Sequence, residues 1–132
     1  MRLGDLRFQD ARDTAALEAY QRAASIDPSN TAPTDAVARV RAVLEIDPSR
    51  RGLPIRERVR RWDLILARVV DALGKCEGNQ ESLDPARKLL QSKAVNVELA
   101  DRKMDAALGL WRKAPMCVQD PVVTHVLGRF SE

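Results

Sequence analysis

The chain has very little of the chemistry on which most enzymes depend. Its 132 residues include one histidine, His125, and two cysteines, Cys76 and Cys117. A histidine-based catalytic triad or zinc site would have to use His125, and no Gly-x-Ser-x-Gly sequence marks a nucleophile. No glycine-rich phosphate-binding loop is present either. The sequence therefore predicts a protein that is not an enzyme and that uses no metal and no cofactor.

Aromatic residues and long apolar runs are also scarce. Phe, Trp and Tyr make up 4% of the chain, although apolar residues make up 45% and charged residues 31%. The core must then be built from Leu, Val, Ile and Ala, and this composition favours packed helices. No run approaches the ~20 apolar residues that a membrane-spanning helix needs. We expect one globular domain over residues 1–132, with no membrane span and no hydrophobic signal segment at its start.

Apolar periodicity predicts an all-α array of antiparallel helix pairs, with about six helices and no strand. Asp13 or Thr14 is expected to cap the second helix, and two Asp-Pro pairs end the second and third helices. The segment 93–96 either breaks the helix that opens at Asp84-Pro85 or continues it into the next. The expected helices cover residues 3–11, 14–25, 35–46, 54–73, 84–92, 97–113 and 121–130, and the fifth and sixth ranges count as one if that segment is continuous.

A short sequence motif, called the repeated phrase below, occurs twice in the first half of the chain. Small and apolar residues followed by proline recur at offsets 0, 4, 7 and 12, and the two copies lie 20 residues apart. The copies end in nearly the same residues, Ser25-Ile26-Asp27-Pro28-Ser29 and Glu45-Ile46-Asp47-Pro48-Ser49. We expect Ile26 and Ile46 to be buried in equivalent positions.

The first copy, "ALEAYQRAASIDPSN", resembles the second helix of a tetratricopeptide repeat, with its small, aromatic and small residues before a proline. Leu3-Gly4 falls where that family carries a Leu-Gly pair in its first helix. The second copy follows after 20 residues rather than about 34, so residues 1–48 are TPR-like and residues 49–132 are a divergent helical continuation. The resemblance implies a non-enzymatic scaffold whose groove binds a protein or peptide segment.

Arginine dominates the positive charge, with 17 of the 22 basic residues and a net charge of +3. Codon usage in a GC-rich bacterial genome explains abundant Arg and Ala, and we expect a bacterial protein. The densest basic cluster, Arg50–Arg61, is interpreted as a solvated face, as a site for an acidic protein, or as a nucleic-acid contact. Arg7, Arg39, Arg58 and Arg61 are the candidate partner-binding residues. A self-associating structural subunit is a third possible function.

The two cysteines each follow the expected end of a helix. If Cys76 and Cys117 lie on the same side of the array, they form a disulfide and place the protein in an oxidising compartment such as a bacterial periplasm. If they do not, they are free thiols and a cytoplasmic protein is expected.

Overall fold

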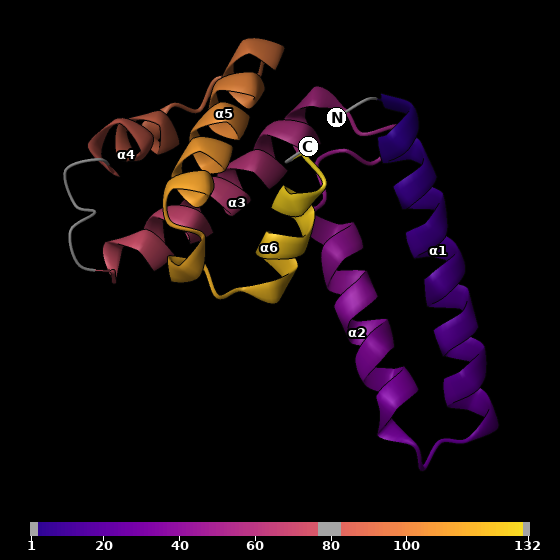
Figure 1. Cartoon of the computed structure of the whole chain (residues 1–132). Helices are drawn as coiled ribbons and strands as arrows, with labels where there is room; N and C mark the ends of the chain where they lie inside the picture. The colour runs from indigo at the N-terminus through magenta and orange to yellow at the C-terminus, as the bar shows by residue number, and fades with distance from the viewer. Residues whose placement is uncertain (1–2, 77–82, 131–132) are drawn as a thin grey trace.

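The computed structural model describes the backbone of residues 3–76 and 83–130, and the side chains of residues 14–76 and 83–130. Helices are the only regular elements in these ranges, so the all-α class and the helix array are confirmed (Figure 1). The elements are α1 (Leu3–Ile26), α2 (Thr31–Ile46), α3 (Ile55–Gly74), α4 (Asp84–Gln91), α5 (Val97–Lys113), the 3-10 turn η2 (Pro115–Cys117) and α6 (Pro121–Gly128).

The first helix differs from the sequence-based expectation. We expected a break between residues 11 and 14, but α1 runs without interruption for 24 residues. Asp13 and Thr14 lie inside the helix, so the expected cap at this point is wrong. The reason is that no Gly or Pro occurs between Asp5 and Asp27, and a residue with a mild preference for caps does not end a helix without such a breaker.

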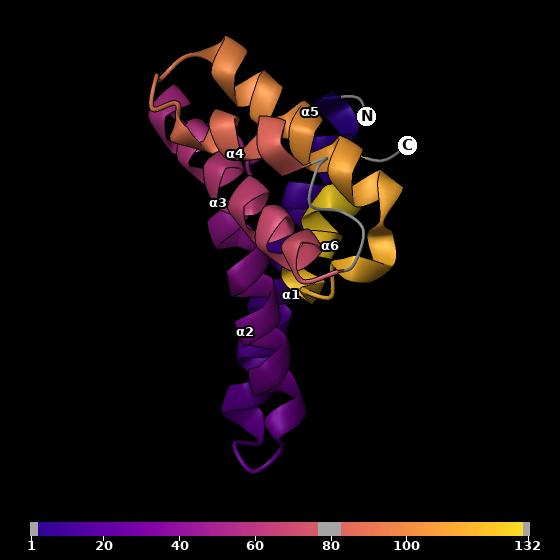
Figure 2. The same cartoon turned by 90° about the vertical axis from the view of Figure 1, so that its left-hand side faces the viewer.

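Helices α1 and α2 form an antiparallel hairpin that projects from the rest of the molecule (Figures 1 and 2). The amide of Asp27 donates to the Ala23 carbonyl at 3.2 Å as α1 ends. The Asn30 side chain then accepts from the Ala32 amide at 3.1 Å and caps α2. Because of this cap, α2 begins four residues before the expected Asp35, with Pro33 tolerated in its first turn.

Helices α3 to α6 make up the body of the molecule, with α3 against α5 as its main pair. Asn96 caps α5 through a 2.8 Å bond from the Leu99 amide, so the break at residues 92–96 is real. A buried lysine also joins this pair: Lys103, 1% exposed, donates to the Asp63 carboxylate at 2.6 Å. Trp62 meets Phe130 edge to face, with ring centroids 5.2 Å apart, and this contact packs the end of α6 against α3.

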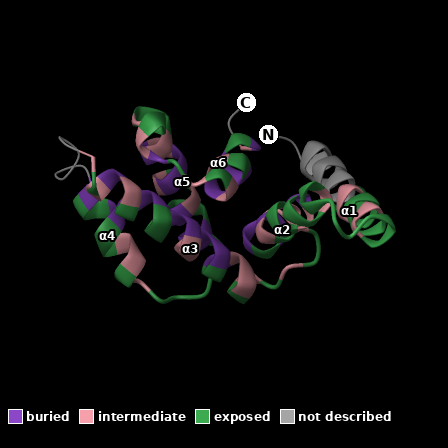
Figure 3. Ribbon diagram, turned by 90° about the horizontal axis from the view of Figure 1, so that it is seen from below, coloured by how far each residue is buried: buried purple, intermediate pink, exposed green. Residues whose placement is uncertain are grey.

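Burial is concentrated in the body. Figure 3 shows buried residues on α3, α5, α6 and one side of α2. Between Thr14 and Ile26 no residue of α1 is buried. Helix α1 packs chiefly against α2, and α2 in turn contacts α6 and α3.

The two copies of the repeated phrase have the same local turn in different surroundings. The Ser29 hydroxyl donates to Asp27 Oδ1 at 2.6 Å, and the Ser49 hydroxyl donates to Asp47 Oδ1 at 2.6 Å. Ile46 is 6% exposed, which confirms its predicted burial. Ile26 is 82% exposed, so its predicted burial is wrong. The reason is its position at the free end of the hairpin, where none of the described helices covers it.

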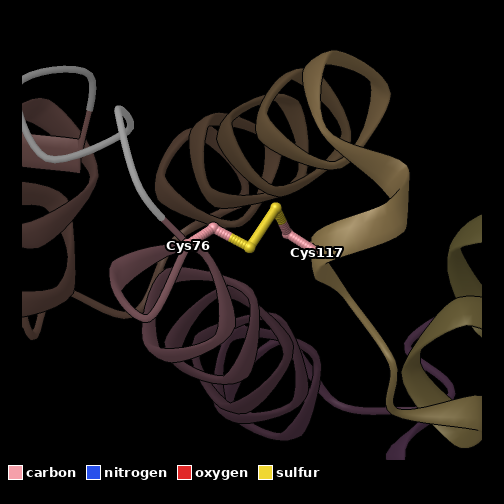
Figure 4. Close-up of a disulfide and its surroundings, with 2 residues drawn as sticks. All are labelled: Cys76 and Cys117. Carbon is pink, nitrogen blue, oxygen red and sulfur yellow. A yellow bond between two sulfur atoms is a disulfide. The ribbon is translucent and has the colours of Figure 1, made fainter.

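A disulfide joins Cys76 to Cys117 (Figure 4). Cys76 follows the end of α3 and Cys117 closes η2, and their Cα atoms are 6.1 Å apart. The bond links residues separated by 41 positions. It fixes the connection between α5 and α6 against the end of α3.

Candidate protein-binding site

The four candidate arginines do not form one surface. The side chain of Arg7 lies outside the residues whose side chains are described. Arg39 is exposed on α2, Arg58 is half-buried on α3, and Arg61 is 8% exposed. The structure therefore leaves Arg39 as the candidate that stands open to a partner.

Arg61 has a structural role, which corrects its assignment as a partner-binding residue. Its Nη1 donates to the carbonyls of Leu44 at 2.8 Å and Asp47 at 2.9 Å. The final carbonyls of a helix have no partner within the helix, and a buried guanidinium satisfies them here. The expectation treated Arg61 as one member of a surface cluster of arginines. In the structure Arg61 lies on the line of Ile65 and Val69, both fully buried.

A second arginine, Arg129, also binds the turn between α2 and α3. Asp47, with 0% exposure, forms an ion pair with Arg129, which is 6% exposed and 82 residues away in the sequence. Ser49 completes the set with a 2.9 Å bond from its amide to Asp47 Oδ1. The turn between α2 and α3 is thus fixed to the end of α6, and this contact attaches the hairpin to the body.

The start of α3 carries a local ion-pair network. Glu57 accepts from Arg60 Nε at 2.9 Å and from Arg61 Nε at 3.0 Å. The hydrogen bond from Arg60, followed by that from Arg61, lowers the pKa of Glu57 from 4.5 to about 2. The same contact raises the pKa of Arg60. Part of the Arg50–Arg61 cluster is therefore neutralised within the chain.

A shallow apolar groove lies where α6 packs against α2. Three residues of α2 and three of α6 line a volume of about 220 Å³: Arg39, Val40, Val43, Pro121, Val122 and His125. Asp120 sets the start of α6, because its Oδ1 accepts from the amides of Val122 at 3.0 Å and Val123 at 3.2 Å. The groove has a valine floor with Arg39 on one helix and His125 on the other, and both of these side chains are exposed.

The single histidine takes part in this groove, which the sequence did not suggest. Arg129 Nη2 lies 3.0 Å from His125 Nε2. A guanidinium can only donate hydrogen bonds, so Nε2 accepts here and the imidazole proton resides on Nδ1. That Nδ1–H is a donor that the arginine does not use. Arg39 and His125 thus give the groove a polar rim that favours an acceptor or an anion.

The described part of the chain was also compared with what a metal site and a membrane-spanning helix require. No group of three or more His, Cys, Asp or Glu side chains there is arranged to hold a metal ion. Among the helices that the structure describes, none is both long and apolar enough to cross a bilayer.

Comparison of the sequence with protein-family models gives no match, and comparisons with curated proteins and with solved structures give none either.

Proposed function

We propose that this chain is a non-enzymatic helical interaction module. The groove between α2 and α6 binds a protein segment that presents one apolar side chain next to a carboxylate. The observation that carries the proposal is the apolar floor of Val40, Val43 and Val122 with Arg39 and His125 beside it.

The size of the groove supports a side chain rather than a cofactor as its occupant. Sites for drug-sized molecules and cofactors occupy about 300–1,000 Å³, and this groove has about 220 Å³. A few well-buried anchor residues near the centre of an interface carry most of the binding energy of a protein contact. The valine floor takes such an anchor, and the rim supplies the charge-assisted bonds that orient it.

The resemblance to tetratricopeptide repeats supports the same proposal. Helices α1 and α2 form an antiparallel hairpin of the general kind that such scaffolds stack. The nucleic-acid alternative loses support, since Arg61 is buried and Arg60 is paired with Glu57. Arg61 is thereby withdrawn from phosphate binding, and the charge of Arg60 is partly neutralised by Glu57.

The compartment belongs to the proposal as well. A disulfide between Cys76 and Cys117 persists in an oxidising environment. Together with the arginine-rich and alanine-rich composition, it supports a bacterial periplasmic scaffold protein.

The groove can be tested with a minimal ligand. N-acetyl-L-leucine carries one apolar side chain and one carboxylate, and N-acetyl-L-leucinamide is its neutral control. Titration into ¹⁵N-labelled protein should shift the amide signals of Val40, Val122 and His125, with a dissociation constant on the order of millimolar. The amide should bind more weakly by about threefold, because the rim then loses its anionic partner.

A matched pair of variants checks the position of the site. Arg39→Glu should weaken binding of N-acetyl-L-leucine by about threefold or more. Arg41→Glu should leave it unchanged, because Arg41 is also exposed on α2 but lies about 200° around the helix. Shifts that avoid the α2–α6 groove, or equal effects of the two variants, would show that the groove is not the binding site.

A further inference from the structure

The free end of the α1–α2 hairpin presents an apolar side chain beside a carboxylate. Ile26 is 82% exposed and Asp27 follows it in the turn. The Asn30 cap fixes the end of this turn at the start of α2, and the Ser29 hydroxyl donates to the Asp27 carboxylate. In Figures 1 and 2 this end is the part of the hairpin farthest from the body.

The chain itself shows what such a turn packs against. The second copy of the phrase, Ile46-Asp47-Pro48-Ser49, has the same bond from serine hydroxyl to aspartate. There the isoleucine is buried in the core and the aspartate pairs with Arg129. An apolar surface with an arginine beside it is therefore the environment that already covers one copy of this turn.

The groove between α2 and α6 offers that environment on the surface. We infer that Ile26 of one copy inserts between the valines of the groove in a second copy, and that Asp27 faces Arg39 and His125. This inference rests on the proposed function, since it names the occupant of the same groove. Charge complementarity and the volume of the groove, which suits one apolar side chain, are the observations behind it.

The contact has to form between two molecules. Asn30 caps α2 and Val40 lies ten positions further along, so the hairpin end lies about 15 Å along α2 from the groove. The helix cannot fold back to close that distance. The contact is also head to tail, because each copy uses a different surface. A bound pair keeps one free hairpin end and one free groove, and association proceeds to larger species unless a ring closes.

Sedimentation velocity tests this association on the intact chain. From about 10 μM to about 1 mM, the range in which small interfaces associate, the average mass should rise with concentration. Ile26→Asp and Arg39→Asp should each keep the protein monomeric, with helical circular dichroism retained because both positions are exposed. Arg41→Asp should associate like the wild type. A wild type that stays monomeric up to about 1 mM overturns the inference.

A charge exchange makes the test specific. Asp27→Arg and Arg39→Asp should each be monomeric alone, and mixed together they should associate again to larger species in which the two variants alternate. The reason is that the introduced arginine of one variant then faces the introduced aspartate of the other, while the native Asp27 of the second variant faces the native Arg39 of the first. Ser29→Ala removes the hydroxyl bond to Asp27 but keeps its charge, and it should associate like the wild type.

The outcomes separate the two proposals. If the mixture stays monomeric, or if Ser29→Ala abolishes association as fully as Asp27→Arg does, the pairing of Asp27 with Arg39 is wrong. If N-acetyl-L-leucine binds the groove while the wild type stays monomeric, the groove binds another segment and only the self-association fails. If the probe does not bind and the chain still associates, the proposed groove function fails as well, because association then uses another surface.

Discussion

Removing the side chain of Arg129 should cost the protein a large part of its stability. Arg129→Met replaces the guanidinium with an apolar chain of similar length. It leaves the Asp47 carboxylate, which has 0% exposure, with hydrogen bonds from Ser49 but without its cation. It also removes the contact with His125. The contacts that this substitution removes lie where the α2–α3 turn meets the end of α6.

The size of the effect follows from the burial of both partners. Breaking a buried ion pair by removing one partner typically costs about 3–5 kcal/mol, because the remaining charge is left uncompensated. Asp47→Asn in the Arg129→Met background removes that charge and should recover part of the loss. The double variant should therefore be more stable than Arg129→Met alone, by about 1–3 kcal/mol.

Urea unfolding followed by circular dichroism measures these differences. With a slope of about 2 kcal/mol/M, the loss in Arg129→Met lowers the midpoint by about 2 M. Arg41→Met is the matched control, since Arg41 is exposed, and it should change stability by less than about 0.5 kcal/mol. A loss below about 1 kcal/mol in Arg129→Met, or a double variant less stable than the single one, would refute the role given to this pair.

Three further perturbations have defined outcomes. In urea unfolding, Ile46→Ala should lower the free energy of unfolding by about 2–4 kcal/mol, whereas Ile26→Ala should change it by less than about 0.5 kcal/mol. Equal effects of the two substitutions would contradict the different burial of these residues. The lowered pKa of Glu57 means that the unfolded chain takes up a proton there between pH 4.5 and about 2 while the folded chain does not. Stability should therefore fall as the pH drops through this window, and Glu57→Gln should remove that part of the slope. Unreduced protein should contain no titratable thiol at Cys76 or Cys117, and two free thiols would contradict the disulfide. Reduction should lower the melting temperature. For a separation of 41 residues, loop entropy predicts that the free energy of unfolding falls by about 4 kcal/mol.

The helices were largely predictable because their ends carry strong local signals. Asp27-Pro28 and Asp47-Pro48 close α1 and α2, and Gly74 closes α3. The false break near Asp13 shows the limit of such reasoning. A residue that favours caps has only a mild effect inside a helix, and nothing nearby forces the chain to turn.

The candidate site was predictable only in part, because it is assembled from distant segments. Arg39 was a candidate, but the groove also needs Val122 and His125, which lie more than 80 positions further along the chain. Arg61 was misplaced for a related reason. Its position four residues before Ile65 put it on the buried stripe, but only the carbonyls of Leu44 and Asp47 explain why a charge is stable there.

The attachment of α1 also affects how the protein exchanges its amide hydrogens. This helix packs chiefly against α2 and lies outside the loop closed by the disulfide. Opening of α1 over residues 14–26 exposes little apolar surface, since this range includes no buried side chain. Its amides can therefore exchange through a local opening while α3 and α5 stay protected until the whole molecule unfolds. The hairpin end thus belongs to the least protected part of the chain, and a partner that holds it should slow exchange along α1 first.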